Sequence, residues 1–559
     1  MRTPRGGSAG AAMPAKHSVA IYGGGVGGLS AAHELAERGF AVTVYERNAA
    51  FGGKARSLSV AGSGIGGRSD LPGEHGFRFF PGFYKHVTDT MHRIPFGTNG
   101  GTCHDNLVQA TRILLARQGK LDPLWVARFP ETLDDFRTAF LALFDNLGIP
   151  HHEIAFFVTR LLALATSCDE RFLEEYEQIT FWDFIGANAR SESYRRYLGQ
   201  GMTRSLVAMR AEDSSTRTVG RILLQLFYGI LIPGRVFDRL LAGPTNDVWI
   251  DPWRKHLTER LAVTLIPNAT ARAFNLEGDR LASVSVECNG ELRAVTADYH
   301  VAAMPVEVMQ QLLTPELARA APSLSRLPEL RTEWMNGIQF YLATDAPLAD
   351  GHAIYLDSNW ALTSISQRQF WRGYDLSTYG NGRVGGILSV DISNWSAPGN
   401  FSGKTAMSAV SREEIKAEVW AQLKAALNAA GDVQLDDANL VDWFLDPDIQ
   451  LPNPGTVTNV EPLLINHVGS LAARPEAFTE IDNLFLASDY VRTYTDLATM
   501  EGANEAARRA TNAILAVSGV AAPPCELWEF DIPLAMRNAQ LLDQVRFRMG
   551  LPNLLLALG

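Results

Sequence analysis

The chain has 559 residues, enough for several domains or for two large interleaved ones. Hydrophobic residues make up 46% and charged residues 20%, which is typical of a globular protein and excludes a largely disordered chain. The formal net charge of −11 leaves no broad basic surface to bind a phosphate backbone, so we expect no nucleic-acid partner.

The cysteines and the apolar runs restrict the cellular setting. The four cysteines show neither CxxC nor zinc-site spacing, so we expect no disulfide framework, no metal and a reduced, cytoplasmic location. No apolar run reaches the ~18–20 residues that a spanning helix needs. Residues 1–16 lack the apolar core of a signal peptide and are predicted to form a flexible leader. Contact with a membrane surface stays open.

The first predicted unit is a βαβ motif with glycines at its first turn. A strand over His17–Tyr22 leads into Gly23–Gly28, followed by a helix over Leu29–Arg38. A second strand, Ala41–Tyr45, ends at Glu46. This order predicts the start of a parallel sheet that binds a dinucleotide.

Each residue type in this turn has a physical role. Gly23 makes the turn, Gly25 has no Cβ to block a pyrophosphate, and Gly28 lets the helix pack closely on the strand. The helix N-terminus supplies free N–H groups to the phosphates. The carboxylate of Glu46 can accept hydrogen bonds from ribose hydroxyls and disfavours a 2′-phosphate, so FAD or NAD is preferred over NADP.

Two following segments favour FAD. Phe51–Ser57 contains a second glycine turn whose cations can reach the same pyrophosphate. Glu74–Tyr84 is unusually rich in aromatic residues for an exposed loop. From Leu107 to Gly243 the pattern is mainly helical and predicts an inserted helical region, in which Ile222–Ile232 is apolar nearly all round.

The second half of the chain is predicted to add a β-meander and another sheet. Asn289-Gly290 is a strong hairpin signal within the meander. The other predicted elements are the meander strands Thr270–Leu276, Leu281–Glu287 and Glu291–Thr296, the strands Tyr299–Ala303, Asn336–Ala343, Ala353–Leu356, Ala361–Gln367, Gly385–Ser393 and Leu484–Ala487, and the helices Arg412–Ala430 and Met500–Val517.

These motifs resemble a known family. The spacing from Glu46 to Gly52-Gly53-Lys54 is similar to that of the flavin amine oxidase superfamily. Glu74–Tyr84 more narrowly resembles phytoene and ζ-carotene desaturases of the plant and cyanobacterial type, which are related to hydroxysqualene dehydroxylases. Asn483–Tyr490 and Ala498–Ala503 resemble the C-terminal block of the same family in order and separation.

The resemblance implies an α/β fold in which a Rossmann-like FAD-binding domain of the amine oxidase type is interleaved with an α+β substrate domain. The FAD-binding domain is expected over residues 17–100, 250–310 and 465–520. The substrate domain, with its helical insertion, is expected over residues 101–249 and 311–464. Residues 521–559 would form a tail that contacts a membrane or a partner.

The resemblance also implies a set of FAD-binding residues. The helix that starts near Met500 would point its N-terminus at the flavin, where negative charge is stabilised on reduction. Gly469–Arg474 contains no Cys or His for covalent attachment, so FAD is expected to be bound non-covalently. The implied residues are Gly23, Gly25, Val26, Gly27, Gly28, Glu46, Arg47, Gly53, Lys54, Gly76, Phe77, Ala271, Asp489, Met500 and Ala503.

Three positions depart from the family pattern. Lys54 replaces a usual arginine, Ser488 a usual glycine, and Arg78 the histidine of the desaturases. Arg78, a permanent cation, could orient an anionic group or a quinone near the flavin, or it could form a structural ion pair. We take Arg78, Tyr341 and Asp391 as catalytic candidates, and Gln339, Trp360 and Gln367 as further candidate walls of the substrate pocket.

The sequence therefore predicts a flavoenzyme that dehydrogenates a hydrophobic isoprenoid or lipid by hydride transfer to the flavin, with a quinone or oxygen as electron acceptor. An amine or amino-acid oxidase that releases hydrogen peroxide is one alternative. A prenyl-binding escort protein without redox chemistry is another. Two apolar segments, Ile222–Ile232 and Val545–Leu558, fit either core packing or insertion into one membrane leaflet.

Overall fold

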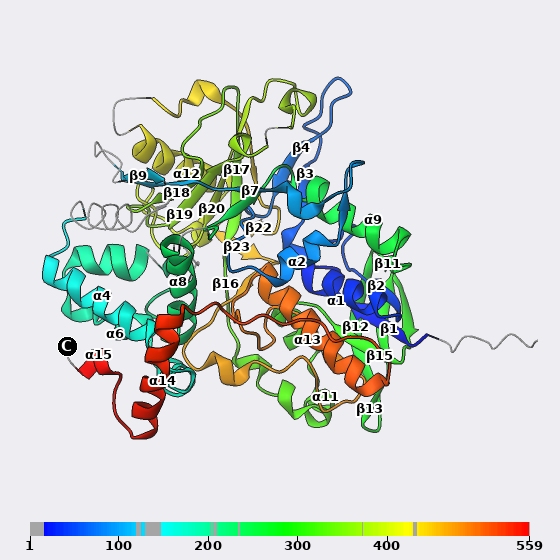
Figure 1. The fold of residues 1–559 in the computed structure, drawn as a ribbon. Helices are drawn as coiled ribbons and strands as arrows, with labels where there is room; N and C mark the ends of the chain where they lie inside the picture. Colours follow the sequence, from blue (N-terminus) through cyan, green and yellow to red (C-terminus); the bar gives the residue numbers. More distant parts are fainter. Residues whose placement is uncertain are drawn as a thin grey trace, which may run out of the picture.

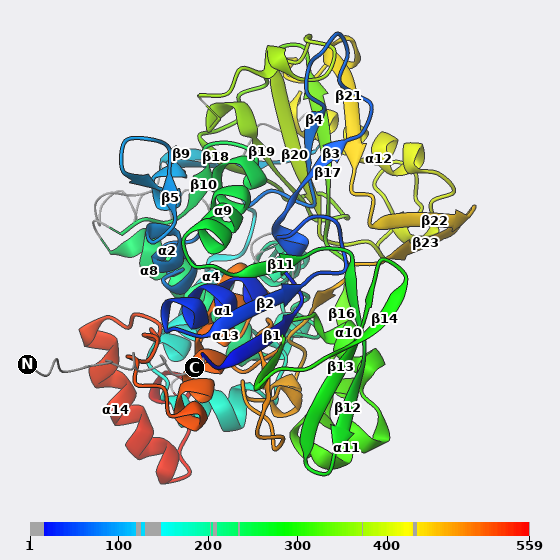
Figure 2. The same cartoon turned by 90° about the vertical axis from the view of Figure 1, so that its right-hand side faces the viewer.

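A computed structural model describes residues 16–118, 125–128, 147–201, 203–204, 209–232, 235–371, 373–428 and 433–557. The predicted leader, except its last residue, lies outside these ranges, as do the predicted end of the helix at Ala430 and residue Leu558 of the tail. Two main sheets occupy different halves of the molecule (Figures 1 and 2).

The first half is built on a parallel five-stranded sheet of order β11-β2-β1-β15-β25. Its strands come from distant parts of the chain, and their apolar side chains form one core with helices α1 (Val26–Glu37) and α13 (Met500–Ser518). The predicted α/β class is confirmed. The strands are β1 (Ser18–Tyr22), β2 (Ala41–Tyr45), β11 (Thr264–Ile266), β15 (Tyr299–Ala302) and β25 (Leu484–Leu486).

The predicted β-meander is also confirmed. It comprises β12 (Ala269–Glu277), β13 (Arg280–Cys288) and β14 (Glu291–Val295). Asn289 and Gly290 have φ angles of 51° and 84°, so both lie in the left-handed region that a type I′ hairpin turn requires.

The second half contains a seven-stranded sheet of order β21-β17-β20-β19-β18-β8-β9. Helix α12 (Arg412–Leu427) packs its apolar residues against one face. The other face is turned to the first half of the molecule. The strands are β21 (Leu440–Leu445), β17 (Asn336–Leu342), β20 (Gly386–Ile392), β19 (Leu362–Ser366), β18 (Gly351–Tyr355), β8 (Arg112–Ala116) and β9 (Trp125–Arg128).

The mainly helical region predicted between Leu107 and Gly243 begins and ends with strands that were not predicted. Strand β8 pairs in parallel with β18, so the second sheet recruits a segment more than 200 residues earlier in the chain. Strands β7 (Leu107–Gln109) and β10 (Arg239–Leu241) pair with each other at the two ends of the region. The pattern RILLA fits either a helix or a buried strand, and pairing with β18 decides it.

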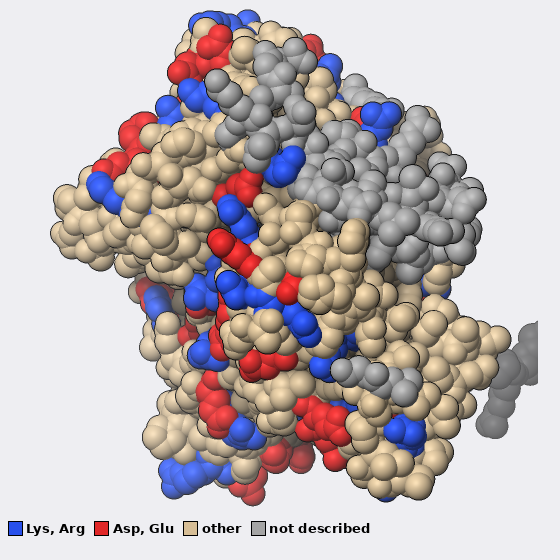
Figure 3. Space-filling model, turned by 90° about the vertical axis from the view of Figure 1, so that its left-hand side faces the viewer, with Lys and Arg blue, Asp and Glu red and all other residues tan. Residues whose placement is uncertain are grey.

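The α-helices described in this region are α4 (His151–Ala165), α5 (Asp169–Arg171), α6 (Phe181–Phe184) and α8 (Thr216–Leu231). Helix α8 contains the apolar run at Ile222, and Ile222 and Leu223 are each 1% exposed. The described part of the run is therefore largely core, which favours core packing over membrane insertion for α8. Figure 3 shows acidic and basic side chains interspersed on the face that forms the left-hand side of the molecule in Figure 1.

Smaller elements complete the fold. The short paired strands are β3 (Ser57–Val60) with β4 (Leu71–Glu74), β5 (Pro95–Phe96) with β6 (Gly101–Thr102), β16 (Thr332–Glu333) with β24 (Leu463–Leu464), and β22 (Ile449–Asn453) with β23 (Thr456–Asn459). The remaining α-helices described are α2 (His86–His92), α9 (Asp251–Glu259), α10 (Val306–Leu312), α11 (Pro315–Ala320), α14 (Leu534–Arg548) and α15 (Leu554–Ala557).

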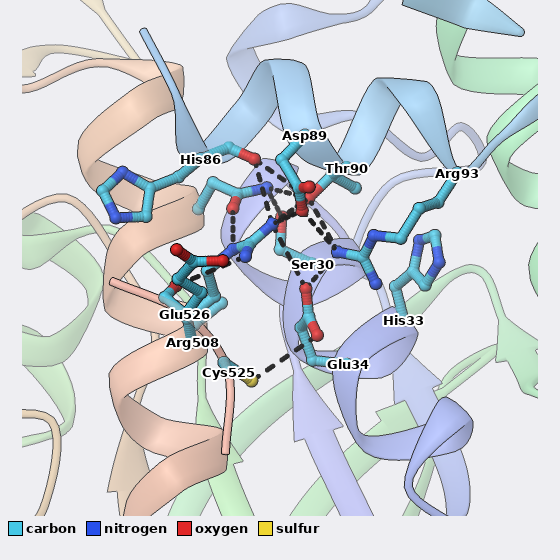
Figure 4. A network of polar contacts seen from close by, with 12 residues as sticks. Ser30, His33, Glu34, His86, Asp89, Thr90, Arg93, Arg508, Cys525 and Glu526 are labelled. Carbon is cyan, nitrogen blue, oxygen red and sulfur yellow. Dashed lines mark hydrogen bonds and ion pairs between the residues drawn. The ribbon is translucent and has the colours of Figure 1, made fainter. Parts of the chain in front are cut away.

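A buried ionic cluster joins α1, α2 and α13 (Figure 4). Arg508 of α13 lies 3.4 Å from the Glu34 carboxylate of α1 and 2.5 Å from that of Asp89 in α2. Arg93 also pairs with Glu34, and the Cys525 thiol lies 3.5 Å from it. Burial alone would raise the pKa of Glu34, but the surrounding arginines lower it to about 2. The cluster therefore fixes the three helices as one unit.

The C-terminal segment crosses the molecule before forming α14. Asp543 of α14 is buried and pairs with Arg171 of α5 at 2.9 Å. On its outer side, α14 exposes Leu541, Val545 and Met549. Among the described residues, no helix combines the length and the hydrophobicity that crossing a membrane requires.

Candidate active site

A large cavity begins at the glycine turn after β1 and reaches the inner face of the seven-stranded sheet. The three segments predicted to bind FAD meet on its wall: the turn after β1, the Gly53-Lys54 turn, and the segment from Ser488 to Ala503. Side chains of β18, β19 and β20 and of helix α8 line its other part. The cavity therefore connects a nucleotide-binding turn with an apolar chamber.

The geometry of the glycine turn suits a bound pyrophosphate. Gly23 has φ +110°, and a Cβ there would lie 2.6 Å from the Ala303 carbonyl oxygen. At Gly25 the nearest neighbour of an added Cβ is Gly53 Cα at 3.6 Å, so the backbone faces open space. Helix α1 begins without a side-chain cap, which leaves its first N–H groups for an anion.

Gly28 has a packing role instead. It does not line the cavity, and a Cβ there would lie 1.8 Å from the Gly23 carbonyl oxygen. Gly27, which does line the cavity, is restricted in the same way by the Ala487 carbonyl oxygen at 2.1 Å. These two glycines bring α1 close to β1 and β25, which positions the helix N-terminus.

Glu46 lies on the cavity wall and is 4% exposed. Its carboxylate accepts hydrogen bonds from the backbone N–H of Gly24 at 2.7 Å and of Asn48 at 2.8 Å. Burial raises the pKa of Glu46, and these two hydrogen bonds oppose the rise. A carboxylate has about four acceptor sites, so it keeps capacity for ribose hydroxyls.

We expect Glu46→Ala to weaken FAD binding by roughly 1–3 kcal/mol, because hydrogen bonds to a charged acceptor are lost. Equilibrium dialysis of the apoprotein against FAD measures the change. Glu46→Gln is the matched control and should lose less, since its amide oxygen can still accept one backbone bond. Unchanged affinity in the alanine variant would contradict the assignment of this wall to the adenosine ribose.

The basic side chains near the second glycine turn are paired with acids. Lys54 Nζ lies 3.3 Å from a Glu307 carboxylate oxygen, and Arg47 pairs with Glu461. Both cations line the cavity, as do Ala271 and Asp489. Lys54 neutralises the Glu307 carboxylate in this structure. Contact between the cations of this turn and the pyrophosphate therefore remains a prediction.

The N-terminus of α13 faces the same cavity through Met500 and Ala503. Thr499 caps the helix by accepting a hydrogen bond from the Gly502 N–H. The Glu501 carboxylate accepts hydrogen bonds from the backbone N–H of Lys85, His86 and Val87 at 2.8–2.9 Å, and it lies 2.7 Å from His86 Nδ1. Glu501 thus joins the start of α2 to the start of α13.

Arg78 lies where the nucleotide turn meets the chamber. Its guanidinium donates to the carbonyl oxygens of Lys54, Ala55 and Gly76, and it forms no ion pair within the described residues. The alternative of a structural ion pair is therefore wrong. Burial lowers the pKa of Arg78, although Glu74 and Asp391 oppose this. Arg78 holds the Gly76-Phe77 backbone against the Gly53 turn.

Asp391 of β20 is the buried acid of the chamber. It is 3% exposed, and its Oδ1 has no hydrogen-bond partner in the described structure. Gly76 packs against it, and a Cβ there would lie 2.7 Å from that oxygen and displace the carboxylate. Burial raises the pKa of Asp391 to about 7, against the opposing charges of Arg78 and His75. An acid with this pKa can exchange a proton near neutral pH.

The structure removes Tyr341 from the catalytic candidates. It is fully buried away from the cavity lining, and its hydroxyl donates to the Pro72 carbonyl oxygen at 2.9 Å. Gln339 and Gln367 donate to Ser389, and Trp360 donates to the Ala397 carbonyl. These three predicted wall residues hold strands and loops together instead of lining the cavity.

Two buried histidine–aspartate pairs at the cavity were not among the predicted site residues. His75 Nδ1 lies 2.6 Å from Asp446, and His352 Nε2 bonds to Asp238. The partners lie more than 100 positions apart in the chain and carry no motif. Of these four residues, only His75 lies in a segment that the sequence had singled out, the aromatic Glu74–Tyr84.

Two groups of residues have metal-ligand chemistry: His33, Glu37 and His256, and His75, Asp446 and Asp448. In the first, His33 Nδ1 accepts from Trp253 Nε1, so His33 Nε2 carries the proton that it donates to Glu37. In the second, Asp446 accepts from His75 and from Asn336. Both ring nitrogens of His256 and Oδ2 of Asp448 have no hydrogen-bond partner among the described residues.

Comparison with known proteins finds a matching family and similar relatives. A family model described as flavin containing amine oxidoreductase matches residues 26–515. The zeta-carotene desaturase of Synechocystis sp. is 24% identical, and the alignment covers 89% of this chain and 97% of the relative. A probable zeta-carotene desaturase of Synechococcus elongatus is 23% identical, with 90% of this chain and 100% of the relative covered.

Solved structures share the fold at low identity. Putrescine oxidase bound to putrescine has a TM-score of 0.59 and 14% identity, covering 90% of this chain and 99% of that one. Cyclohexylamine oxidase from Brevibacterium oxydans has a TM-score of 0.58 and 14% identity, covering 90% and 100%. At this identity the similarity concerns the fold alone.

Proposed function

Because this chain belongs to the flavin-containing amine oxidoreductase family and is thus an FAD-dependent oxidoreductase, we propose that it desaturates a hydrophobic isoprenoid or lipid. One observation carries the proposal: a cavity that starts at a dinucleotide-binding turn continues into an apolar chamber that holds the buried carboxylate of Asp391, whose Oδ1 has no hydrogen-bond partner among the described residues. The two relatives named for ζ-carotene desaturation support the same substrate class.

The chamber wall suits a hydrocarbon chain. Its apolar lining comes from the second sheet and from helix α8, and it includes Ile113, Ile222, Leu226, Phe237 and Ile354. Burying such a chain is favourable by ~0.8 kcal/mol per CH₂ group. Binding energy for a long apolar substrate is therefore available without any specific polar contact.

The chain's own residues divide the chemistry between them. When bound, the flavin supplies the oxidant, taking a hydride from a substrate carbon. Asp391 is the residue that we propose to receive the proton from the neighbouring carbon. Arg78 positions the Gly76 backbone against which Asp391 packs. We propose non-covalent binding of FAD, because Gly469–Arg474 contains no Cys or His.

Anaerobic mixing of the FAD-loaded protein with isoprenoid hydrocarbons and alcohols tests the proposal. We expect the flavin absorption band to bleach, and mass spectrometry to detect a product two hydrogens lighter. The parallel reaction with small primary amines is the control. Bleaching by amines alone would replace desaturation with amine oxidation, and no bleaching by any isoprenoid would contradict the proposal.

Amine oxidation with release of hydrogen peroxide is the second candidate, because the Asp391 carboxylate could pair with a substrate ammonium group. The third alternative, a prenyl carrier without redox chemistry, does not fit membership of an oxidoreductase family. We retain a quinone or oxygen as proposed electron acceptor. Stopped-flow reoxidation with each acceptor distinguishes them, and the faster one identifies the acceptor.

We also propose that the enzyme works in the cytoplasm and that α14 contacts a membrane surface. Its exposed Leu541, Val545 and Met549 lie beside Arg546 and Arg548, a combination that favours anionic lipid. Co-sedimentation with phosphatidylglycerol vesicles should be lost in the double variant Leu541→Glu/Val545→Glu. The contact would be contradicted if the parent and the double variant were recovered equally with the vesicles. It would also be contradicted if neither protein were recovered with them.

A further inference from the structure

A histidine–aspartate pair is built into the apolar chamber. His352 of β18 lines the cavity, and its Nε2 bonds to Oδ2 of Asp238. Asp238 is 2% exposed, and its Oδ1 accepts the Arg239 backbone N–H at 2.8 Å. Because a carboxylate only accepts, the proton of neutral His352 lies on Nε2 and the lone pair on Nδ1.

The His352 ring is held in one orientation. The rings of Phe77 and Phe79 lie 5.5 and 5.3 Å from it, centroid to centroid. In the described part of the chain Nδ1 has no hydrogen-bond partner. The protein does not enclose this atom completely. The free acceptor nitrogen is therefore accessible from the cavity that the ring lines.

His352 is one of three polar residues on adjacent strands. Thr363 of β19 and Asp391 of β20 are opposite each other in the sheet and line the same cavity. A pure hydrocarbon lying on this polar strip would leave Nδ1 of His352 and Oδ1 of Asp391 without partners once water is expelled. An unpartnered buried polar group is costly, so this strip favours a substrate that pairs with one of these atoms over a hydrocarbon of the same skeleton, while the apolar lining still binds the chain.

We propose that the substrate is an isoprenoid alcohol whose hydroxyl donates a hydrogen bond to Nδ1 of His352. This rests on the proposed function and narrows it, because the carotenes for which the relatives are named are hydrocarbons. Asp238 is a positioning residue that fixes the tautomer of His352. A site built to bind a hydroxyl discriminates strongly against the analogue that lacks it.

Binding of matched ligand pairs to the FAD-loaded protein tests this inference. The probes are C15 and C20 isoprenoid alcohols with terminal or internal hydroxyls, each paired with the hydrocarbon of the same skeleton. Binding is followed by the perturbation of the flavin absorption spectrum. We expect at least one alcohol to bind roughly tenfold more tightly than its hydrocarbon, as one buried hydrogen bond allows.

Variants assign the preference to His352. His352→Phe should remove the preference without weakening hydrocarbon binding, and His352→Gln should keep part of it through its side-chain oxygen. His92→Phe is the control, since His92 is exposed and outside the cavity lining. Flavin content and melting temperature verify that each variant is folded, and the ligand comparison in the unmodified protein requires no variant.

Two results would overturn the inference: equal binding of every alcohol and its hydrocarbon, or an alcohol preference that survives in folded His352→Phe. Failure of all isoprenoids to bind or to bleach the flavin is a different result. It would reject the proposed function itself, and the inference with it. Hydrocarbon bleaching without any alcohol preference would leave the proposed function standing and reject only the role of His352.

Discussion

Asp391→Asn is expected to slow substrate-driven flavin reduction by roughly 10²–10⁴-fold while making the folded protein more stable at pH 8. The loss of rate follows from removing the proposed proton acceptor. The gain in stability follows from burial, because a pKa raised from 3.8 to about 7 means that ionisation of Asp391 opposes folding.

The pH dependence fixes the sign of the stability effect. Between about pH 4 and 7 folded Asp391 keeps a proton that the unfolded chain has lost, so folding stability falls as the pH rises through this range. Asparagine cannot ionise. The variant should therefore match the parent near pH 4 and exceed it at pH 8 by about 1–4 kcal/mol, measured by urea unfolding.

Asp442→Asn is the matched control for the rate measurement. Asp442 lies on β21 of the same sheet but outside the cavity lining. It should leave the rate of flavin reduction at the parental value. An Asp391→Asn enzyme that reduces flavin at the parental rate would remove Asp391 as the proton acceptor, whatever its stability.

Glu501→Ala is expected to destabilise the protein by roughly 3–5 kcal/mol and to reduce its FAD content. The carboxylate accepts three backbone N–H bonds at the start of α2 and also contacts His86. Alanine leaves those buried donors without an acceptor. Because α13 presents Met500 and Ala503 to the cavity, disorder at its first turn reaches the proposed flavin site directly.

Chemical denaturation and the ratio of flavin to protein absorbance measure the two effects. Glu501→Gln retains one acceptor oxygen and should lose less stability than Glu501→Ala. Glu316→Ala, at an exposed position of α11, should change stability by less than about 0.5 kcal/mol. Full flavin content in Glu501→Ala would show that the junction of α2 and α13 does not support the cofactor site.

The sequence predicted the nucleotide half well because its signals are local. Gly23–Gly28 and Glu46 lie within one βαβ unit, and Asn289-Gly290 specifies a hairpin by its own backbone preference. Each of these elements depends on residues fewer than 30 positions apart. Local patterns of this kind survive any later choice of tertiary packing.

The substrate half was predicted less well because its arrangement depends on distant contacts. Tyr341 and Asp391 both point to the inner face of the second sheet, as strand alternation suggests, but β4 packs over Tyr341 and leaves Asp391 at the cavity. No pattern in β17 reveals that cover. The pairing of His352 with Asp238 likewise depends on how β18 and β10 approach each other.

The order of synthesis adds a consequence of the parallel sheet. Strands β1 and β2 leave the ribosome more than 400 residues before β25 and α13, which complete their sheet and cover it. The nucleotide-binding half therefore cannot close until β25 and α13 have been made. During that interval its apolar strands need protection, so dependence on chaperones and late capture of the flavin follow from the topology.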